Sequence, residues 1–107
     1  EEYIGLESEK IIISFIRKCV GEFEVGELIK TPNNKFKVKI YEDISGKYTG
    51  YTNLLLKDDT GCGYPGVGQG ETIEEALENT ILCFLKMISE KESFSVRNFE
   101  CADAFDF

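Results

Sequence analysis

GVGQGETIEEALEN, residues 66–79, is a glycine-rich turn that runs directly into the first turns of an amphipathic helix. Thr72 and Glu75 have the spacing of a capping box, in which a hydroxyl and a carboxylate satisfy free backbone N–H groups at a helix start. The helix is predicted over residues 73–90, and we expect the preceding strands to pack on it. Its predicted inner face has the i, i+3, i+4, i+7 spacing of one helical stripe and comprises Ile73, Ala76, Leu77, Thr80, Ile81, Phe84, Leu85 and Ile88.

Strands are predicted on both sides of this helix. The clearest one contains Phe36, Val38 and Ile40, which alternate with polar residues in the manner of a half-buried strand. Short turns rich in Pro, Asn, Asp and Gly separate the strands that precede the helix, which indicates an antiparallel meander. Residues 57–70 are expected to form a long irregular loop. The further strands are expected at residues 23–29, at residues 48–56, as a short segment near residues 66–69 within that loop, and at residues 94–99.

A second helix is predicted over residues 8–20. Ser8 is a candidate N-cap, and Gly21 lies where a helix commonly ends. The β-branched run Ile11–Ile13 also suits a buried strand, so that alternative stays open. The expected fold class is α+β: an antiparallel sheet of three to five strands packed against one long helix (73–90), with an additional N-terminal helix. The apolar stripe of the second helix consists of Ile12, Phe15, Ile16, Cys19 and Val20.

Length and composition indicate one globular domain, residues 1–107. The chain has 107 residues, 42% of them hydrophobic, and a net charge of −8, which argues against nonspecific nucleic-acid binding. No apolar run is long enough to span a bilayer, and no signal peptide is visible. The four cysteines are far apart and there is no histidine, so we expect reduced thiols, a cytoplasmic location and no structural zinc.

Several residues are candidates for chemistry. Gly66, Gly68 and Gly70 precede a helix as in phosphate-binding loops, but the acidic first turn opposes an anion, so a structural role is favoured. The carboxylate pairs Glu42–Asp43 and Asp58–Asp59 suit Mg²⁺ or, more simply, turns. Cys62 lacks a histidine partner that would activate its thiol. The sequence therefore predicts no catalytic residue, no cofactor and no metal site.

The chain resembles the HicB-like antitoxin domain over about residues 35–99. The resemblance rests on Phe36-x-Val38-x-Ile40, on Gly46-x-Tyr48, and most specifically on Gly70-x-Thr72-x-x-Glu75-Ala76-Leu77-x-Asn79. That family has a small α+β fold, a degenerate relative of ribonuclease H, in which three strands precede a helix and a short strand often follows it. Its members bind and block a small basic ribonuclease toxin. The resemblance implies a non-enzymatic antitoxin-like or inhibitor protein with a basic or nucleic-acid-processing partner.

A nucleic-acid-binding domain similar to the double-stranded-RNA-binding domain is the alternative. The order of elements and the lysine row Lys35, Lys37 and Lys39 favour it, although a solvated strand face explains these lysines equally well. Against it, the long helix opens with glutamates where phosphate-gripping residues would be basic.

A partner-binding surface is predicted on the outer side of the long helix, together with the C-terminal tail. Apolar residues beyond the main stripe leave a second patch there, and the tail adds aromatic rings. We expect a homodimer, or a dimer-like site for another protein, built from this patch. The alternative is that the N-terminal helix or the tail covers it within one monomer. The candidate residues are Leu82, Cys83, Met87, Phe105 and Phe107.

Overall fold

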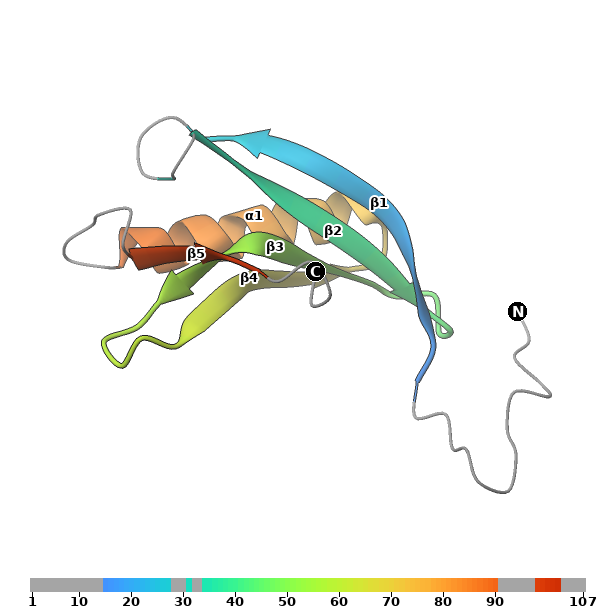
Figure 1. The fold of residues 1–107 in the computed structure, drawn as a ribbon. Helices are drawn as coiled ribbons and strands as arrows, with labels where there is room; N and C mark the ends of the chain where they lie inside the picture. The colour runs from blue at the N-terminus through green and yellow to red at the C-terminus, as the bar shows by residue number, and fades with distance from the viewer. Residues whose placement is uncertain (1–14, 28–30, 32–33, 91–97, 103–107) are drawn as a thin grey trace, which may run out of the picture.

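The structure, a computed structural model, describes residues 15–27, 31, 34–90 and 98–102. These residues form an antiparallel five-stranded sheet with one helix lying across one of its faces (Figure 1). The elements in chain order are β1 (Arg17–Gly26), β2 (Lys35–Asp43), β3 (Tyr48–Lys57), β4 (Gly63–Gly70), α1 (Ile73–Ser89) and β5 (Phe99–Cys101).

The strands β1 to β4 follow one another across the sheet, and β5 returns to the central strand β3. The first half of β3 pairs with β2, and residues 54–56 pair with β5. Because β4 holds the other side of β3, β2 and β5 share one side and meet near Asn53. The side chain of Asn53 accepts the Lys37 N–H at 2.7 Å, and its carbonyl accepts the Ala102 N–H at 2.6 Å. Asn53 therefore lies where the pairing of β3 with β2 ends and its pairing with β5 begins.

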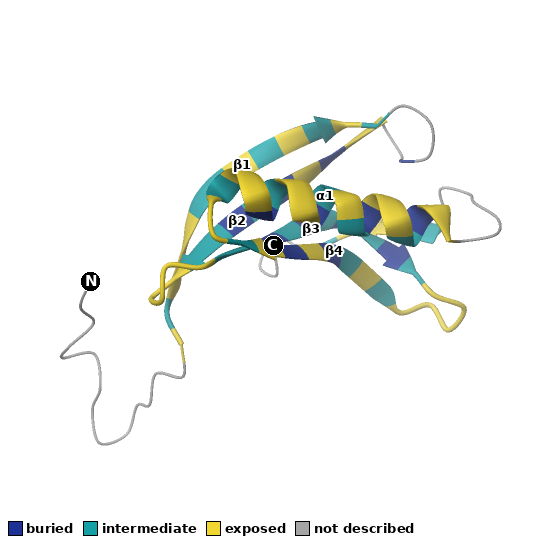
Figure 2. Cartoon of the chain, turned by 180° about the vertical axis from the view of Figure 1, so that it is seen from behind, coloured by how far each residue is buried: buried dark blue, intermediate teal, exposed yellow. Residues whose placement is uncertain are grey.

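The core lies between α1 and the sheet, where Figure 2 shows the buried residues. Phe84 is its central side chain, because the Phe84 ring centroid lies 5.0 Å from that of Phe36 and 6.5 Å from that of Phe99. Strands from before and after the helix therefore pack on one helical residue. The buried apolar residues are Phe36, Val38, Ile40, Leu54, Leu56, Ala76, Phe84, Ile88 and Phe99.

Glycines allow the helix to lie directly on β4. A Cβ added to Gly66 would lie 2.5 Å from the Phe84 Cβ, and one added to Gly70 would lie 2.7 Å from the Ala76 backbone nitrogen. At Gly68 the added atom would overlap the backbone of Thr80. Real Cβ atoms do not approach backbone this closely, so a side chain at these positions would push the helix away. The glycines expected to be structural are structural, and they form the contact between helix and sheet.

The helix and most strands were predicted correctly. The predicted helix 73–90 is confirmed as α1, and the predicted strands 48–56 and 66–69 are parts of β3 and β4. Two expectations near them were wrong. Residues 57–70 are not a long irregular loop, because β4 occupies residues 63–70 and pairs with β3. Leu85, expected on the inner face, is 37% exposed.

The predicted N-terminal helix 8–20 is wrong for the residues that the structure describes. Residues 17–20 belong to β1, and residues 8–14 lie outside the described part of the chain. The physical reason is pairing: β1 matches β2 from Arg17↔Asp43 to Gly26↔Lys35, and this ladder includes nine of the ten residues of β1. The predicted strand 94–99 also differs from the structure. β5 comprises Phe99–Cys101, and residues 94–97 lie outside the described part of the chain.

We predict that Gly68→Ala lowers the free energy of unfolding by at least about 1–3 kcal/mol, the usual cost of overpacking a core. The added methyl group overlaps helix backbone, which moves less readily than a flexible side chain. Urea unfolding measures the change. Gly26→Ala is the matched control, because nothing lies within 4 Å of a Cβ there. Equal stability of the two variants would contradict the close contact between α1 and β4.

Candidate functional site

The start of α1 is closed by its own side chains. The Thr72 hydroxyl accepts the Glu75 N–H at 3.0 Å, as the capping box predicts. The Glu75 carboxylate reaches back to the N–H of Glu71 at 2.7 Å, one residue earlier than in the standard motif. Two of the N–H groups near the helix start are therefore already used, and a carboxylate lies beside them. This arrangement leaves the glycine-rich turn poorly suited to binding phosphate.

The outer side of α1 carries a row of glutamates, and an exposed leucine follows them along the same line of the helix. Glu74, Glu78 and Leu82 follow one another at four-residue spacing, so they lie along one line of the helix surface. All three are exposed, and Figure 2 shows α1 from the exposed side. Leu82 is 58% exposed, and Leu85 widens the apolar end. We call Glu74, Glu78, Leu82 and Leu85 the outer face of α1.

The predicted partner-binding residues differ in how exposed they are, and two of them lie outside the described residues. Leu82 lies on the outer face of α1, as expected for a contact residue. Cys83 and Met87 are half-buried on its flank, and Met87 packs against the core. Phe105 and Phe107 lie outside the described residues. Sequence reasoning missed Leu85, because the helical stripe alone assigned it to the inner face.

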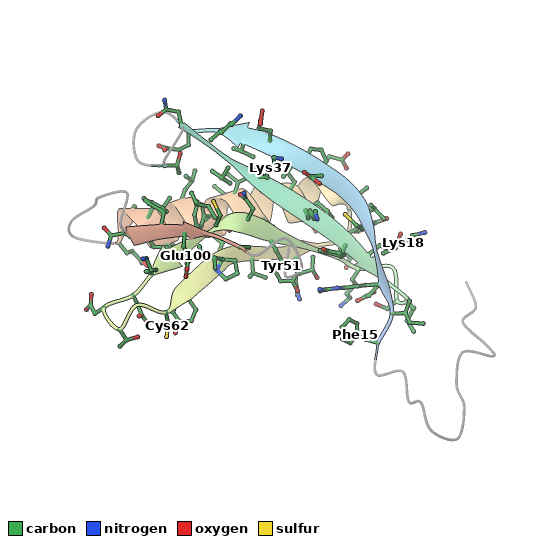
Figure 3. The ribbon with its side chains drawn as sticks, viewed as in Figure 1. Phe15, Lys18, Lys37, Tyr51, Cys62 and Glu100 are labelled. Atoms are coloured by element: carbon green, nitrogen blue, oxygen red, sulfur yellow. The ribbon has the colours of Figure 1, made fainter. Side chains whose placement is uncertain are left out.

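The lysine row lies on the sheet face opposite α1, and ion pairs from β1 neutralise part of it. Lys35 lies 3.2 Å from the Glu24 carboxylate, and Lys37 lies 3.7 Å from that of Glu22. Lys37, labelled on β2 in Figure 3, is exposed and alternates with Phe36 and Val38, which are buried in the core. All four side chains are about half-exposed, so each pair contributes little to stability. Their effect is to cancel the positive charge that a nucleic acid would need.

An arginine–tyrosine cluster on the same sheet face was not predicted. The Arg17 guanidinium lies 4.3 Å from the Tyr41 ring centroid and 5.3 Å from that of Tyr51, and it donates to the Tyr51 hydroxyl at 3.2 Å. Sequence reasoning had assigned Arg17 to a helix, where it would not meet either ring. A cavity of about 200 Å³ adjoins the cluster, and its lining residues are Phe15, Ile16, Arg17, Tyr41, Asp43 and Thr49.

The carboxylates considered for Mg²⁺ hold two matching turns instead. Asp43 Oδ1 accepts the N–H of Ser45 at 2.9 Å, its hydroxyl at 2.6 Å and the N–H of Lys47 at 3.1 Å. Asp58 Oδ1 accepts the equivalent groups of Thr60, at 2.8 and 2.6 Å, and the N–H of Cys62 at 3.0 Å. In the described part of the chain, no group of three or more His, Cys, Asp or Glu residues is placed to hold a metal ion.

These hydrogen bonds set the electrostatics of both turns. The Ser45 hydroxyl is the largest influence that lowers the pKa of Asp43, and the Thr60 hydroxyl does the same for Asp58. The Asp58 charge in turn raises the pKa of the Tyr64 phenol. Each turn also contains a glycine with positive φ, 85° at Gly46 and 89° at Gly61. Both loops are therefore D-x-[S/T]-G-x turns that join neighbouring strands.

Comparison with known proteins adds no assignment: no family model, curated protein or solved structure matches the chain. Among the described residues, no helix has the length and apolar character needed to cross a membrane. The four cysteines, of which Cys19, Cys62 and Cys101 are exposed, carry free thiols.

We predict that the two turn aspartates stabilise the fold at neutral pH and lose this effect in acid. A carboxyl group whose pKa is lowered by folding stabilises the protein above its unfolded pKa of about 3.9, and this stabilisation disappears as the pH falls through the lower folded value. The Asp43→Asn, Asp58→Asn double variant should therefore lose less melting temperature than the wild type between pH 5 and pH 2. Asp59→Asn, at a neighbour that accepts none of these bonds, is the control and should follow the wild type. A double variant with an unchanged acid transition would contradict the assignment.

Proposed function

We propose that this chain is a non-enzymatic protein-binding module of the antitoxin or inhibitor type, which occludes a basic or nucleic-acid-processing partner through the outer face of α1. The observation that supports this most directly is the exposed Leu82 and Leu85 at the end of an acidic row. The resemblance to HicB-like antitoxins supports the same function. Its implied arrangement is three strands, a helix and a short strand, which is the order of β2, β3, β4, α1 and β5.

The two parts of the outer face have different physical roles in this proposal. Glu74 and Glu78 attract a basic partner at long range and orient its approach, an effect that raises the association rate. Leucine provides affinity, because fully burying one such side chain contributes roughly 1.5–3 kcal/mol. Leu82 lies next to Glu78 along the helix, so a partner with a cationic rim around an apolar contact fits both.

The double-stranded-RNA-binding alternative receives less support. Its lysine row is partly neutralised by Glu22 and Glu24, and the first turn of α1 carries Glu74 and Glu75. Phosphate binding requires uncompensated positive charge, because affinity comes from displaced counterions. A cytoplasmic location is proposed with the inhibitor function, since the free thiols suit a reducing compartment.

We predict that the chain captures a basic protein from extracts of its native host and that Leu82→Glu weakens this complex at least tenfold. The substitution places a charge where the proposal buries apolar surface, and tenfold corresponds to about 1.4 kcal/mol. Calorimetric titration of the recovered partner gives the dissociation constant. Val67→Glu is the matched control, because Val67 is exposed on β4, away from the outer face. If both variants bind as the wild type does, α1 does not form the interface.

We predict no measurable affinity for double-stranded RNA at low salt. Low ionic strength strengthens phosphate contacts, so this condition favours the alternative as far as possible. Fluorescence anisotropy of a labelled duplex is the measurement, with a basic RNA-binding domain as positive control. Saturable binding that is lost in Lys37→Glu would favour the nucleic-acid function over the inhibitor function.

A further inference from the structure

We propose that the free edge of β1 pairs with the same edge of a second copy, so that two chains form one continuous antiparallel sheet. The inference concerns a surface separate from α1 and does not depend on what α1 binds. Of the described strands, only β2 pairs with β1, and only β3 pairs with β4. The two long edges of the sheet are therefore formed by β1 and β4, and they differ in how well they are protected against pairing with another strand.

The β4 edge is protected at two positions. The Gly66 N–H bonds to Thr52 of β3 at 2.8 Å, so residues 65, 67 and 69, which alternate with it, direct their backbone groups outward. Pro65 has no N–H to offer there. The Gln69 carbonyl is already bonded to the Asn79 side chain at 2.7 Å. An incoming strand would find few partners along β4, as is common for edges that avoid pairing.

The β1 edge offers backbone groups at known positions. Lys37 directs its N–H toward β3, where Asn53 accepts it, so the alternating residues Phe36 and Val38 direct theirs toward β1. Their partners Val25 and Phe23 use their backbone groups in that ladder. The Glu27 N–H, which bonds to the Asn34 carbonyl at 2.9 Å, continues the same alternation. Glu22, Glu24 and Gly26 consequently point their N–H and C=O groups away from β2.

The side chains of β1 do not block this edge. The strand contains no proline, and Glu24 and Glu22 are held toward Lys35 and Lys37 of the neighbouring strand. Charged side chains such as Lys18 and a bulge between Cys19 and Gly21 are the features of β1 that usually discourage pairing. The position of the bulge decides whether a second copy can pair, because the extra residue changes which residues of β1 direct their backbone N–H and C=O groups outward.

The pattern of β1 is complementary to itself when a two-fold axis passes through Glu22. Val20 is the extra residue of the bulge, so Cys19 lies two ladder positions from Glu22 on one side and Glu24 lies two positions away on the other. Cys19 of each copy then opposes Glu24 of the other, and both belong to the outward-directed set. A strand without the bulge would place residue 20 there instead.

The same axis brings the apolar side chains together. Phe23 of one copy lies opposite the bulge of the other, beside Val20, and both residues are half-buried against the core of their own chain. The second copy would complete their burial. The two Glu22 carboxylates meet at the axis, but each has a lysine partner, Lys37, at 3.7 Å within its own chain. The opposed like charges are therefore compensated from both sides.

A disulfide across the axis tests this arrangement directly. In a Cys62→Ser, Cys101→Ser background, Glu24→Cys places a thiol opposite Cys19 of the second copy. Hydrogen-bonded antiparallel pairs have Cα atoms about 5.5 Å apart, which suits a disulfide. Within one chain the two residues are about 14 Å apart along the strand, too far to bridge. Mild oxidation with diamide should give a covalent dimer on a non-reducing gel, which Cys19→Ser abolishes. Glu78→Cys in the same Cys62→Ser, Cys101→Ser background is the matched control, and it should give no covalent dimer on this gel.

Sedimentation equilibrium of the full chain provides the second readout. The wild type should be a dimer whose melting temperature rises with protein concentration. Glu24→Pro should be a monomer whose melting temperature no longer depends on concentration and falls only by the loss of the dimer contact, because the N–H that it removes points outward. Val25→Pro should lower the melting temperature further than Glu24→Pro does, because its N–H bonds to β2 within the chain. A monomeric wild type would overturn the proposal. A dimer that persists in Glu24→Pro and gives no disulfide would overturn it equally, since the copies would then associate elsewhere.

Discussion

The direct contact between α1 and the glycines of β4 is the constraint on which the rest of the structure depends. With Gly68 against the backbone of Thr80, the helix cannot rotate or rise without losing this contact. Its buried row follows a single four-residue line, Ala76, Thr80, Phe84 and Ile88. Phe84 is thereby held over the sheet, and the opposite line of the helix, including Leu82, must face outward. The same contact that closes the core therefore determines which residues are displayed.

Local patterns predicted the parts of the fold that are determined locally. The capping residues and the apolar stripe located α1, and the alternation in Phe36, Val38 and Ile40 located β2. The N-terminal helix was wrong because the structure of residues 17–20 depends on pairing with a strand more than 20 positions away. A helical stripe through Cys19 and Val20 contains no information about that partner, and Cys19 is exposed in the strand.

The exposure of the residues on the outer face of α1 was predicted only in part. The exposure of Leu82 follows from its position outside the apolar stripe, whereas that of Leu85 does not, because the stripe includes Leu85 on the inner face. One line of α1 is fully buried against the glycines of β4, whereas Ile73, Leu77 and Ile81 are half-buried beside the core. The Arg17 cluster on the opposite face required β1, β2 and β3 to be placed side by side. No local pattern predicts that juxtaposition.

The return of β5 to the central strand has a consequence for the order in which this chain acquires its structure during synthesis. Phe99 packs near Phe84 and pairs with Leu56, so the second half of β3 lacks one neighbour until the last strand is made. The hairpins and α1 emerge from the ribosome earlier, with Leu54 and Leu56 bordering an incomplete sheet. Final closure therefore awaits residues 99–101, and a nascent chain stalled before them retains an unpaired strand edge at the centre of the sheet.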